Sequence, residues 1–119
     1  MADETARLVD AYYELWGRGE FDRLKGILAD DFSFRGAMDE ADGPAAFVDL
    51  IRRNAPAFGA VGFADVRRVV DGPCAVNLYT FEVGSARIPM AEAFEIRGDR
   101  IARIDLFFDP AKLMPAGGD

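Results

Sequence analysis

The residue types that could carry out chemistry centre on one glutamate, Glu92, in the segment IPMAEAFEI. Successive side chains of a strand point to opposite faces, so this segment places Glu92 on the same face as Met90 and Phe94. The same alternation in the segment RIDLFF gives a second apolar face, formed by Ile104, Leu106 and Phe108. A carboxyl group in such an apolar wall loses hydration, which raises its pKa above the ordinary value of about 4.3 and permits general acid or base catalysis near neutral pH.

Glu92 also has a second interpretation. It could lie at the rim of the cavity, where it is solvated or paired with an arginine such as Arg68. Buried glutamates without a partner are rare, and carboxyl groups with a shifted pKa also occur in structural roles, so both interpretations stay open. Tyr12 is likewise either a core tyrosine with a satisfied hydroxyl or a hydrogen-bond donor to a substrate.

The composition excludes several kinds of catalytic site. The chain has no histidine and one cysteine, Cys74, so the usual ligand sets of zinc, haem and iron–sulfur clusters cannot be assembled. A Ser-His-Asp or Cys-His arrangement is excluded for the same reason. We therefore expect no metal and no cofactor of the protein's own, and any catalysis must use carboxylates, tyrosines, basic side chains, backbone amides or a borrowed cofactor.

The charge of the chain narrows its partners and its location. Fourteen basic and 21 acidic residues give a net charge of −7. Such a chain repels phosphate backbones and anionic headgroups, so we expect neither nucleic acid nor a membrane as partner. A single cysteine forms no internal disulfide, and the opening MADETARLVD lacks the order of a secretory signal, which together predict a cytoplasmic protein.

Helical periodicity dominates the first half of the chain. It predicts two helices near the N-terminus and a third that starts at Pro44 and stops near residues 54–56. The first two helices are expected at residues 5–16 and 21–28. A turn at residues 29–31, a short strand at 32–34 and a loop at 35–44 are expected between the second helix and the third.

The second half of the chain changes to the alternation of strands. Four strands joined by tight turns are expected at residues 62–70, 74–83, 87–96 and 101–108. Helices followed by such a meander predict an α+β fold in which the helices cover one face of a mostly antiparallel sheet. The length of 119 residues leaves room for a single domain spanning residues 1–119.

The order of these elements, with the segments ELWGRGEFDRLKGILADDFSF and AFEIRGDRIARIDLFFDP, resembles the nuclear-transport-factor-two-like superfamily. Its SnoaL-like polyketide cyclases, ketosteroid isomerases and limonene epoxide hydrolases are the enzymes to compare. The resemblance covers nearly the whole chain. It implies a cone with a strongly bent sheet, three N-terminal helices on the concave face and an apolar pocket for a small hydrophobic molecule.

The resemblance also suggests roles for individual residues. Against the ketosteroid isomerases, Tyr12 falls at the oxyanion-hole tyrosine and Glu92 falls near the oxyanion-hole aspartic acid. Gly36 stands where those enzymes have their general base, and Leu28 and Ile51 stand at two supporting tyrosines. Isomerisation by that mechanism would therefore lack its base.

The epoxide hydrolases share less of their chemistry with this chain. Their Asp-Arg-Asp set falls on Glu92, Met90 and Leu106, so one carboxylate of three groups is kept. SnoaL-like cyclases use a carboxylic acid or base in an apolar cavity, which Glu92 could supply.

Two functional hypotheses follow. The first is an acid/base cyclase, isomerase or hydrolase with Glu92 and Tyr12 as catalytic groups. The second is a non-catalytic binding or scaffolding protein of the same fold. In either case the expected contacts with a hydrophobic ligand are Trp16, Phe34, Met90, Leu106 and Phe108.

Two surface features complete the expectations. The outer face of the sheet is expected to form a homodimer through Ala91, Ala93, Arg103, Asp105 and Phe107, because small residues permit close approach and Arg can pair with Asp across a two-fold axis. The acidic residues Asp39, Glu40 and Asp42 are expected to form a solvated loop.

Overall fold

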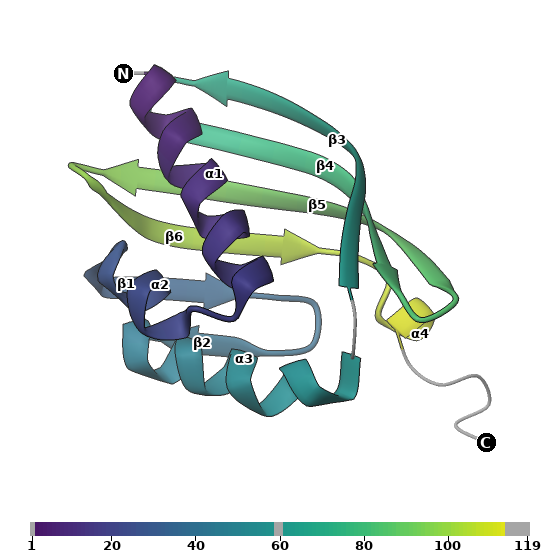
Figure 1. Cartoon of the computed structure of the whole chain (residues 1–119). Helices are drawn as coiled ribbons and strands as arrows, with labels where there is room; N and C mark the ends of the chain where they lie inside the picture. The colour runs from purple at the N-terminus through teal and green to yellow at the C-terminus, as the bar shows by residue number, and fades with distance from the viewer. Residues whose placement is uncertain (1, 59–60, 114–119) are drawn as a thin grey trace.

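The protein is described by a computed structural model that covers residues 2–58 and 61–113. Its helices and strands follow in the order α1 (Ala2–Arg18), α2 (Phe21–Gly26), β1 (Leu28–Arg35), β2 (Glu40–Asp42), α3 (Pro44–Phe58), β3 (Val61–Asp71), β4 (Cys74–Val83), β5 (Ala86–Arg97), β6 (Arg100–Phe107) and α4 (Pro110–Leu113) (Figure 1). Three helices come early and four long strands come late. The predicted α+β class is confirmed.

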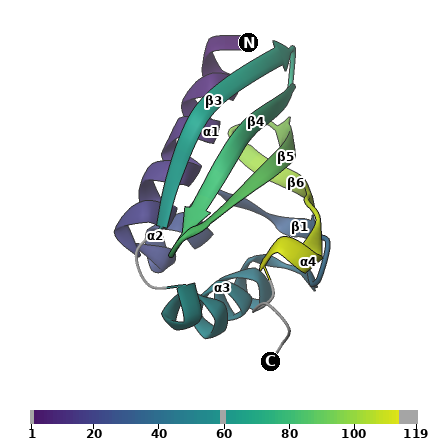
Figure 2. The ribbon, with the colours of Figure 1, turned by 90° about the vertical axis from the view of Figure 1, so that its right-hand side faces the viewer.

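The six strands form one open sheet in the order β2-β1-β6-β5-β4-β3. Strand β1 runs parallel to β6, and every other pair of neighbours is antiparallel, as expected for a mostly antiparallel sheet. Figures 1 and 2 show α1 running across the concave face of the sheet, while α3 packs on β1 and β2. The bent sheet and the helices therefore face one another across the core.

Part of the curvature comes from an irregularity in β3. Its register with β4 shifts between Ala64 and Arg67, and Asp65 there adopts a positive φ of 56°. An extra residue in one strand of a pair increases the local bend and twist. The bent end of β3 brings the ring of Phe63 against Tyr13 and Trp16 of α1, with ring centroids 5.4 and 6.0 Å apart.

The segment between α2 and α3 differs from the expectation. The second helix ends at Gly26, and Leu28 opens β1 by pairing with Ile101, so residues 29–31 belong to a strand and not to a turn. The pairing of β1 with β6 is irregular between Leu28 and Ser33, in the same stretch whose composition is turn-like. The expected loop at 35–44 contains β2, a short polar strand that has no apolar alternation to reveal it.

The third helix also runs further than expected. It begins at Pro44 as predicted but continues to Phe58, beyond the predicted end at residues 54–56.

The core lies between the helices and the inner face of the sheet. One part joins α1, α2, α3, β1 and β6 through residues such as Phe32, Phe47 and Ile104, and a second part lies on β4 and β5 around Phe81 and Ile88. Buried and more exposed residues alternate along β5, and Glu92 is one of the buried, inward-facing residues. Among the described residues, no helix is long and apolar enough to cross a membrane.

Candidate active site

A cavity of about 130 Å³ lies among α1, α3 and the inner face of the sheet. The predicted catalytic residues Glu92 and Tyr12 both line it. So do all five residues that were expected to contact a ligand: Trp16, Phe34, Met90, Leu106 and Phe108. Most other lining side chains are apolar as well. The structure thus brings together every site residue that the sequence singled out.

Glu92 is buried in the wall of this cavity, with 3% of its surface exposed. Three phenols surround its carboxyl group. The hydroxyl of Tyr13 donates to Oε1 over 2.6 Å, and that of Tyr79 donates to the same oxygen over 2.9 Å. The hydroxyl of Tyr12 lies 3.4 Å from Oε2. One oxygen of Glu92 is therefore firmly held, while the other has, within residues 2–58 and 61–113, a single long contact.

The alternative position of Glu92, at the rim or paired with Arg68, is wrong. Arg68 is engaged elsewhere, because its Nε donates to Oδ1 of Asn77 over 2.7 Å and its second guanidinium nitrogen contacts Asp10 over 2.7 Å. In the described part of the chain, the groups that shift the pKa of Glu92 are the three tyrosines and not a cation.

Burial raises the pKa of Glu92 above the ordinary glutamate value, and the hydrogen bonds from the three phenols oppose that shift without cancelling it. Burial also raises the pKa of Tyr12, Tyr13 and Tyr79, and the nearby carboxyl group raises each of them further. The phenols therefore remain neutral hydrogen-bond donors, and Glu92 is the group in this cluster that exchanges a proton first.

Two of these tyrosines were missed in the sequence. Tyr13 follows Tyr12 on α1, about 100° further around the helix, yet both rings reach the sheet and meet edge to face at 5.2 Å. Tyr79 is in phase with the inward-facing Asn77 and Phe81 on β4. The alternation of β4 could have placed Tyr79 inside, but its meeting with Glu92 depends on the register between β4 and β5.

Gly36 lies at the edge of the cavity and leaves no room for a larger residue. A Cβ atom there would approach the ring of Phe34 to 2.9 Å. The position that the resemblance assigned to a general base therefore carries no carboxylate, and a side chain would displace an aromatic wall of the cavity. The resemblance also compared Ile51 and Leu28 with two supporting tyrosines. Ile51 lines the cavity, and Leu28 is buried in the core.

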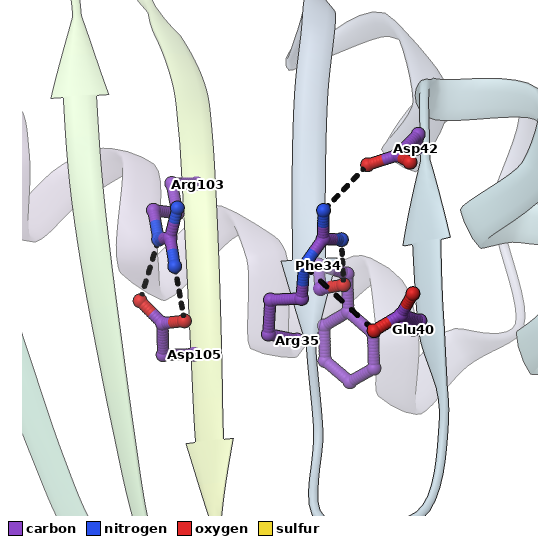
Figure 3. A network of polar contacts seen from close by, with 6 residues as sticks. All are labelled: Phe34, Arg35, Glu40, Asp42, Arg103 and Asp105. Atoms are coloured by element: carbon purple, nitrogen blue, oxygen red, sulfur yellow. Dashed lines mark hydrogen bonds and ion pairs between the residues drawn. The ribbon is translucent and has the colours of Figure 1, made fainter.

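The expected acidic loop is divided by the fold. Asp39 lines the cavity. Glu40 and Asp42 belong to β2 and form ion pairs with Arg35, 3.9 and 3.0 Å away (Figure 3). They are exposed as expected, but they are paired with a cation rather than only solvated. Asp39 is thus the second carboxylate that reaches the site.

Several solved structures share this fold. A candidate polyketide cyclase from Xanthomonas campestris pv. campestris is 19% identical, with a TM-score of 0.81 over 94% of this chain and 95% of that one. A candidate ketosteroid isomerase from Kribbella flavida is 16% identical, with a TM-score of 0.77 over 91% and 79%. An LEH-like epoxide hydrolase from M. tuberculosis is 24% identical, with a TM-score of 0.73 over 93% and 86%.

At these identities the similarity establishes the fold and leaves the chemistry open. A search of curated proteins gives no significant match. The model of the SnoaL-like domain matches residues 9–104, which include α1 from Val9 onward and nearly all of the sheet. The chain belongs to the SnoaL-like domain family.

Proposed function

We propose that this protein binds a small hydrophobic molecule in the cavity and that Glu92 exchanges a proton with it. The observation that supports this most strongly is the burial of one carboxyl group in an apolar wall, with phenols and, among the residues that the structure describes, no cation around it. A raised pKa moves the protonation equilibrium of a carboxyl group toward physiological pH, which is the direction that general acid and base catalysis requires. The reaction classes that fit are cyclisation, isomerisation and hydrolysis.

The two oxygens of Glu92 would divide the work. Oε1 accepts from Tyr13 and Tyr79 and so fixes the plane of the carboxyl group. Oε2, with its single contact of 3.4 Å from Tyr12, is the oxygen that a ligand can approach. When protonated, it donates to an oxygen of the substrate. When ionised, it accepts a proton from the substrate or from water, and Tyr12 can donate to the oxygen on which negative charge develops.

A non-catalytic binding protein is the second candidate. It is supported by the occupation of Oε1, because a carboxylate held by two phenols can also serve purely as an acceptor that fixes the core. The two candidates share the ligand site and differ in whether Glu92 changes the ligand.

Glu92→Gln distinguishes the two candidates, since Gln keeps the shape and can still accept from Tyr13 and Tyr79. We would identify hydrophobic metabolites that co-purify with the wild type by mass spectrometry, and measure 2-naphthol binding by fluorescence as a common probe. As a control, Leu106→Trp fills the cavity beside Glu92, because Leu106 is its neighbour on β6. We expect Glu92→Gln to keep binding 2-naphthol and to lose turnover of the identified metabolite. We expect Leu106→Trp to lose both.

The outcomes separate the candidates. A bound metabolite that the wild type leaves unchanged would favour the non-catalytic protein. Turnover that survives in Glu92→Gln would remove Glu92 from the chemistry. Binding of 2-naphthol that Leu106→Trp does not weaken would place the ligand outside this cavity.

We also propose that the protein forms a homodimer through the outer face of its sheet. Phe107 is 62% exposed there, beside the half-buried Ala91 and Ala93. Arg103 and Asp105 lie on the same face, joined by contacts of 2.8 and 3.1 Å. Light scattering should give twice the 13.0 kDa chain mass, and Arg103→Glu should weaken the dimer. A mass of one chain at micromolar concentration would contradict the proposal.

A cytoplasmic location remains part of the proposal. It is supported by a single cysteine, which cannot form an internal disulfide and therefore suits a reducing compartment.

A further inference from the structure

Strand β4 carries a buried polar side chain, Asn77, that has no part in the proposed function. Asn77 is 1% exposed and pairs directly across the β4–β5 ladder with Glu92. Its Oδ1 accepts from Nε of Arg68 over 2.7 Å. Its Nδ2 is the one buried side-chain nitrogen or oxygen in the described part of the chain that has no hydrogen-bond partner. Such a group is costly to bury, so its presence calls for a physical reason.

Arg68 ties Asn77 to helix α1. Beyond Asn77, its guanidinium contacts Asp10 over 2.7 Å and donates to the backbone carbonyl of Ala6 over 3.3 Å. Ala6, Asp10 and Tyr13 are separated by four and three residues, so they share one face of α1. The contacts of Arg68 therefore fix the height and rotation of α1 over the sheet, and with them the position of the Tyr13 hydroxyl.

The amide nitrogen of Asn77, which has no hydrogen-bond partner, is the donor that this side chain can offer to Tyr13. Burial raises the pKa of the Tyr13 phenol, and Asn77 opposes that shift by lowering it, which is the effect of a hydrogen-bond donor beside the phenol oxygen. A donor beside the Tyr13 oxygen strengthens the hydrogen bond that the same hydroxyl gives to Glu92, because linked hydrogen bonds polarise one another.

We propose that Asn77, anchored by Arg68, is a positioning residue that acts through Tyr13 on Glu92. The amide of Asn77 holds the Tyr13 hydroxyl in the orientation that donates to Oε1, and it completes its own hydrogen bond when Glu92 is ionised. Asn77 and Tyr13 together thus favour the ionised form of Glu92, and Asn77 does so without touching the ligand. The consequence for catalysis rests on the proposed function of Glu92, whereas the coupling itself does not.

Other groups near Glu92 must be separated from this effect. The titratable groups that face it are Tyr12 and Tyr13 from α1, Tyr79 from β4 and, across the cavity, Asp39. Arg68 from β3 and Asp10 from α1 lie one residue further out. The experiment must therefore show that Asn77 acts through Tyr13 and not through the general field of these charges.

A double-mutant cycle read out by the pKa of Glu92 makes that separation. The pKa is measured by NMR titration of protein with ¹³C-labelled glutamate carboxyl groups, and the Glu92 resonance is the one that Glu92→Gln removes. We expect Asn77→Leu to raise the pKa of Glu92 by about half a pH unit or more, the size of one weakened hydrogen bond. In a Tyr13→Phe background, the same substitution should produce no further shift.

Two further variants keep the test decisive. Asn77→Asp retains the acceptor for Arg68 but has no Nδ2 donor. Its own charge also raises the pKa of Glu92 through the field, so only the part of its shift that disappears in the Tyr13→Phe background counts as coupling. Arg67→Gln removes a cation from the opposite face of the same strand and should leave that pKa unchanged. If Asn77→Leu does not fold, Arg68→Gln replaces it in the cycle with the same expectation.

An equal shift with and without Tyr13 would show a direct effect of Asn77 and would overturn the proposal, as would no shift in either background. These results are independent of turnover. If Glu92→Gln keeps full activity while the cycle shows coupling, the proposed function fails and the positioning role stands. If Glu92→Gln abolishes activity and the cycle shows no coupling, only the positioning role fails.

Discussion

The two faces of the sheet treat a carboxylate in opposite ways. On the outer face, Asp105 of β6 meets the guanidinium of Arg103 through two contacts of 2.8 and 3.1 Å, and Arg35 nearby holds two acids of β2 (Figure 3). On the inner face, Glu92 has phenols for partners. In the register of β5 with β6, Ala93 pairs with Asp105 and Glu92 pairs with Leu106, so one residue along the ladder separates the two environments.

The comparison shows why residue type alone does not define a site. A carboxylate with a cation and water beside it is ionised at neutral pH, and an exposed pair of this kind contributes only about 0–1 kcal/mol to stability. A carboxylate without either must lose its charge or find strong donors. The outer acids therefore shape the surface, whereas Glu92 has its protonation equilibrium moved toward neutral pH.

The largest expected effect is the dependence of stability on pH at Glu92. Its pKa is raised in the folded protein above the ordinary value of 4.5, so the wild type loses stability as pH rises from that value to the folded pKa. Each unit of the difference is worth about 1.4 kcal/mol. Glu92→Gln lacks this loss and should stabilise the fold more at pH 8 than at pH 5.

Urea denaturation of both proteins at the two pH values measures this difference. Equal effects of Glu92→Gln at pH 5 and pH 8 would mean that Glu92 resembles the outer acids, and the comparison between the two faces would collapse.

A smaller effect is expected when single phenols are removed, and the size of the change in the pKa of Glu92 should differ between them. Tyr13→Phe removes the 2.6 Å bond to Oε1, so it should raise the pKa of Glu92 further, because a donor that favours the ionised form is lost. Tyr12→Phe removes only a 3.4 Å contact and should raise it less. NMR titration of Glu92 in the two variants compares them directly. A larger shift in Tyr12→Phe would mean that Oε2, and not Oε1, is the anchored oxygen.

The smallest effect is expected on the outer face. Asp42→Asn removes one of the two acids that pair with Arg35, and the side chains of Arg35 and Asp42 are 38% and 77% exposed. The free energy of unfolding should change by less than about 1 kcal/mol, and by less at high salt. A loss comparable to that of a core substitution would show that these outer pairs, too, carry the fold.

Much of the fold and of the site was predictable because both rest on periodicity. Alternation placed Glu92 and Met90 inside, and the helical repeat placed Tyr12 and Trp16 on the buried face of α1. The missing parts are set by distant pairing: β2 forms against β1, and β1 starts early because Leu28 pairs with Ile101.

The phenols Tyr13 and Tyr79 belong to the same class of omission. Each is ordinary in its own element, and they meet Glu92 because α1 lies across β4 and β5 in one particular register. Sequence periodicity fixes which way a side chain faces along its own strand or helix. It does not fix which residue of another element it meets.

The most direct test of this account is the titration of Glu92 in the wild type. In ¹³C NMR of glutamate-labelled protein, six of the seven glutamates should be recognised by their persistence in Glu92→Gln, which leaves Glu92 assigned by its loss. The account predicts that the Glu92 resonance titrates at a pH above the ordinary glutamate value of 4.5. A Glu92 resonance that titrates at or below that value would contradict it.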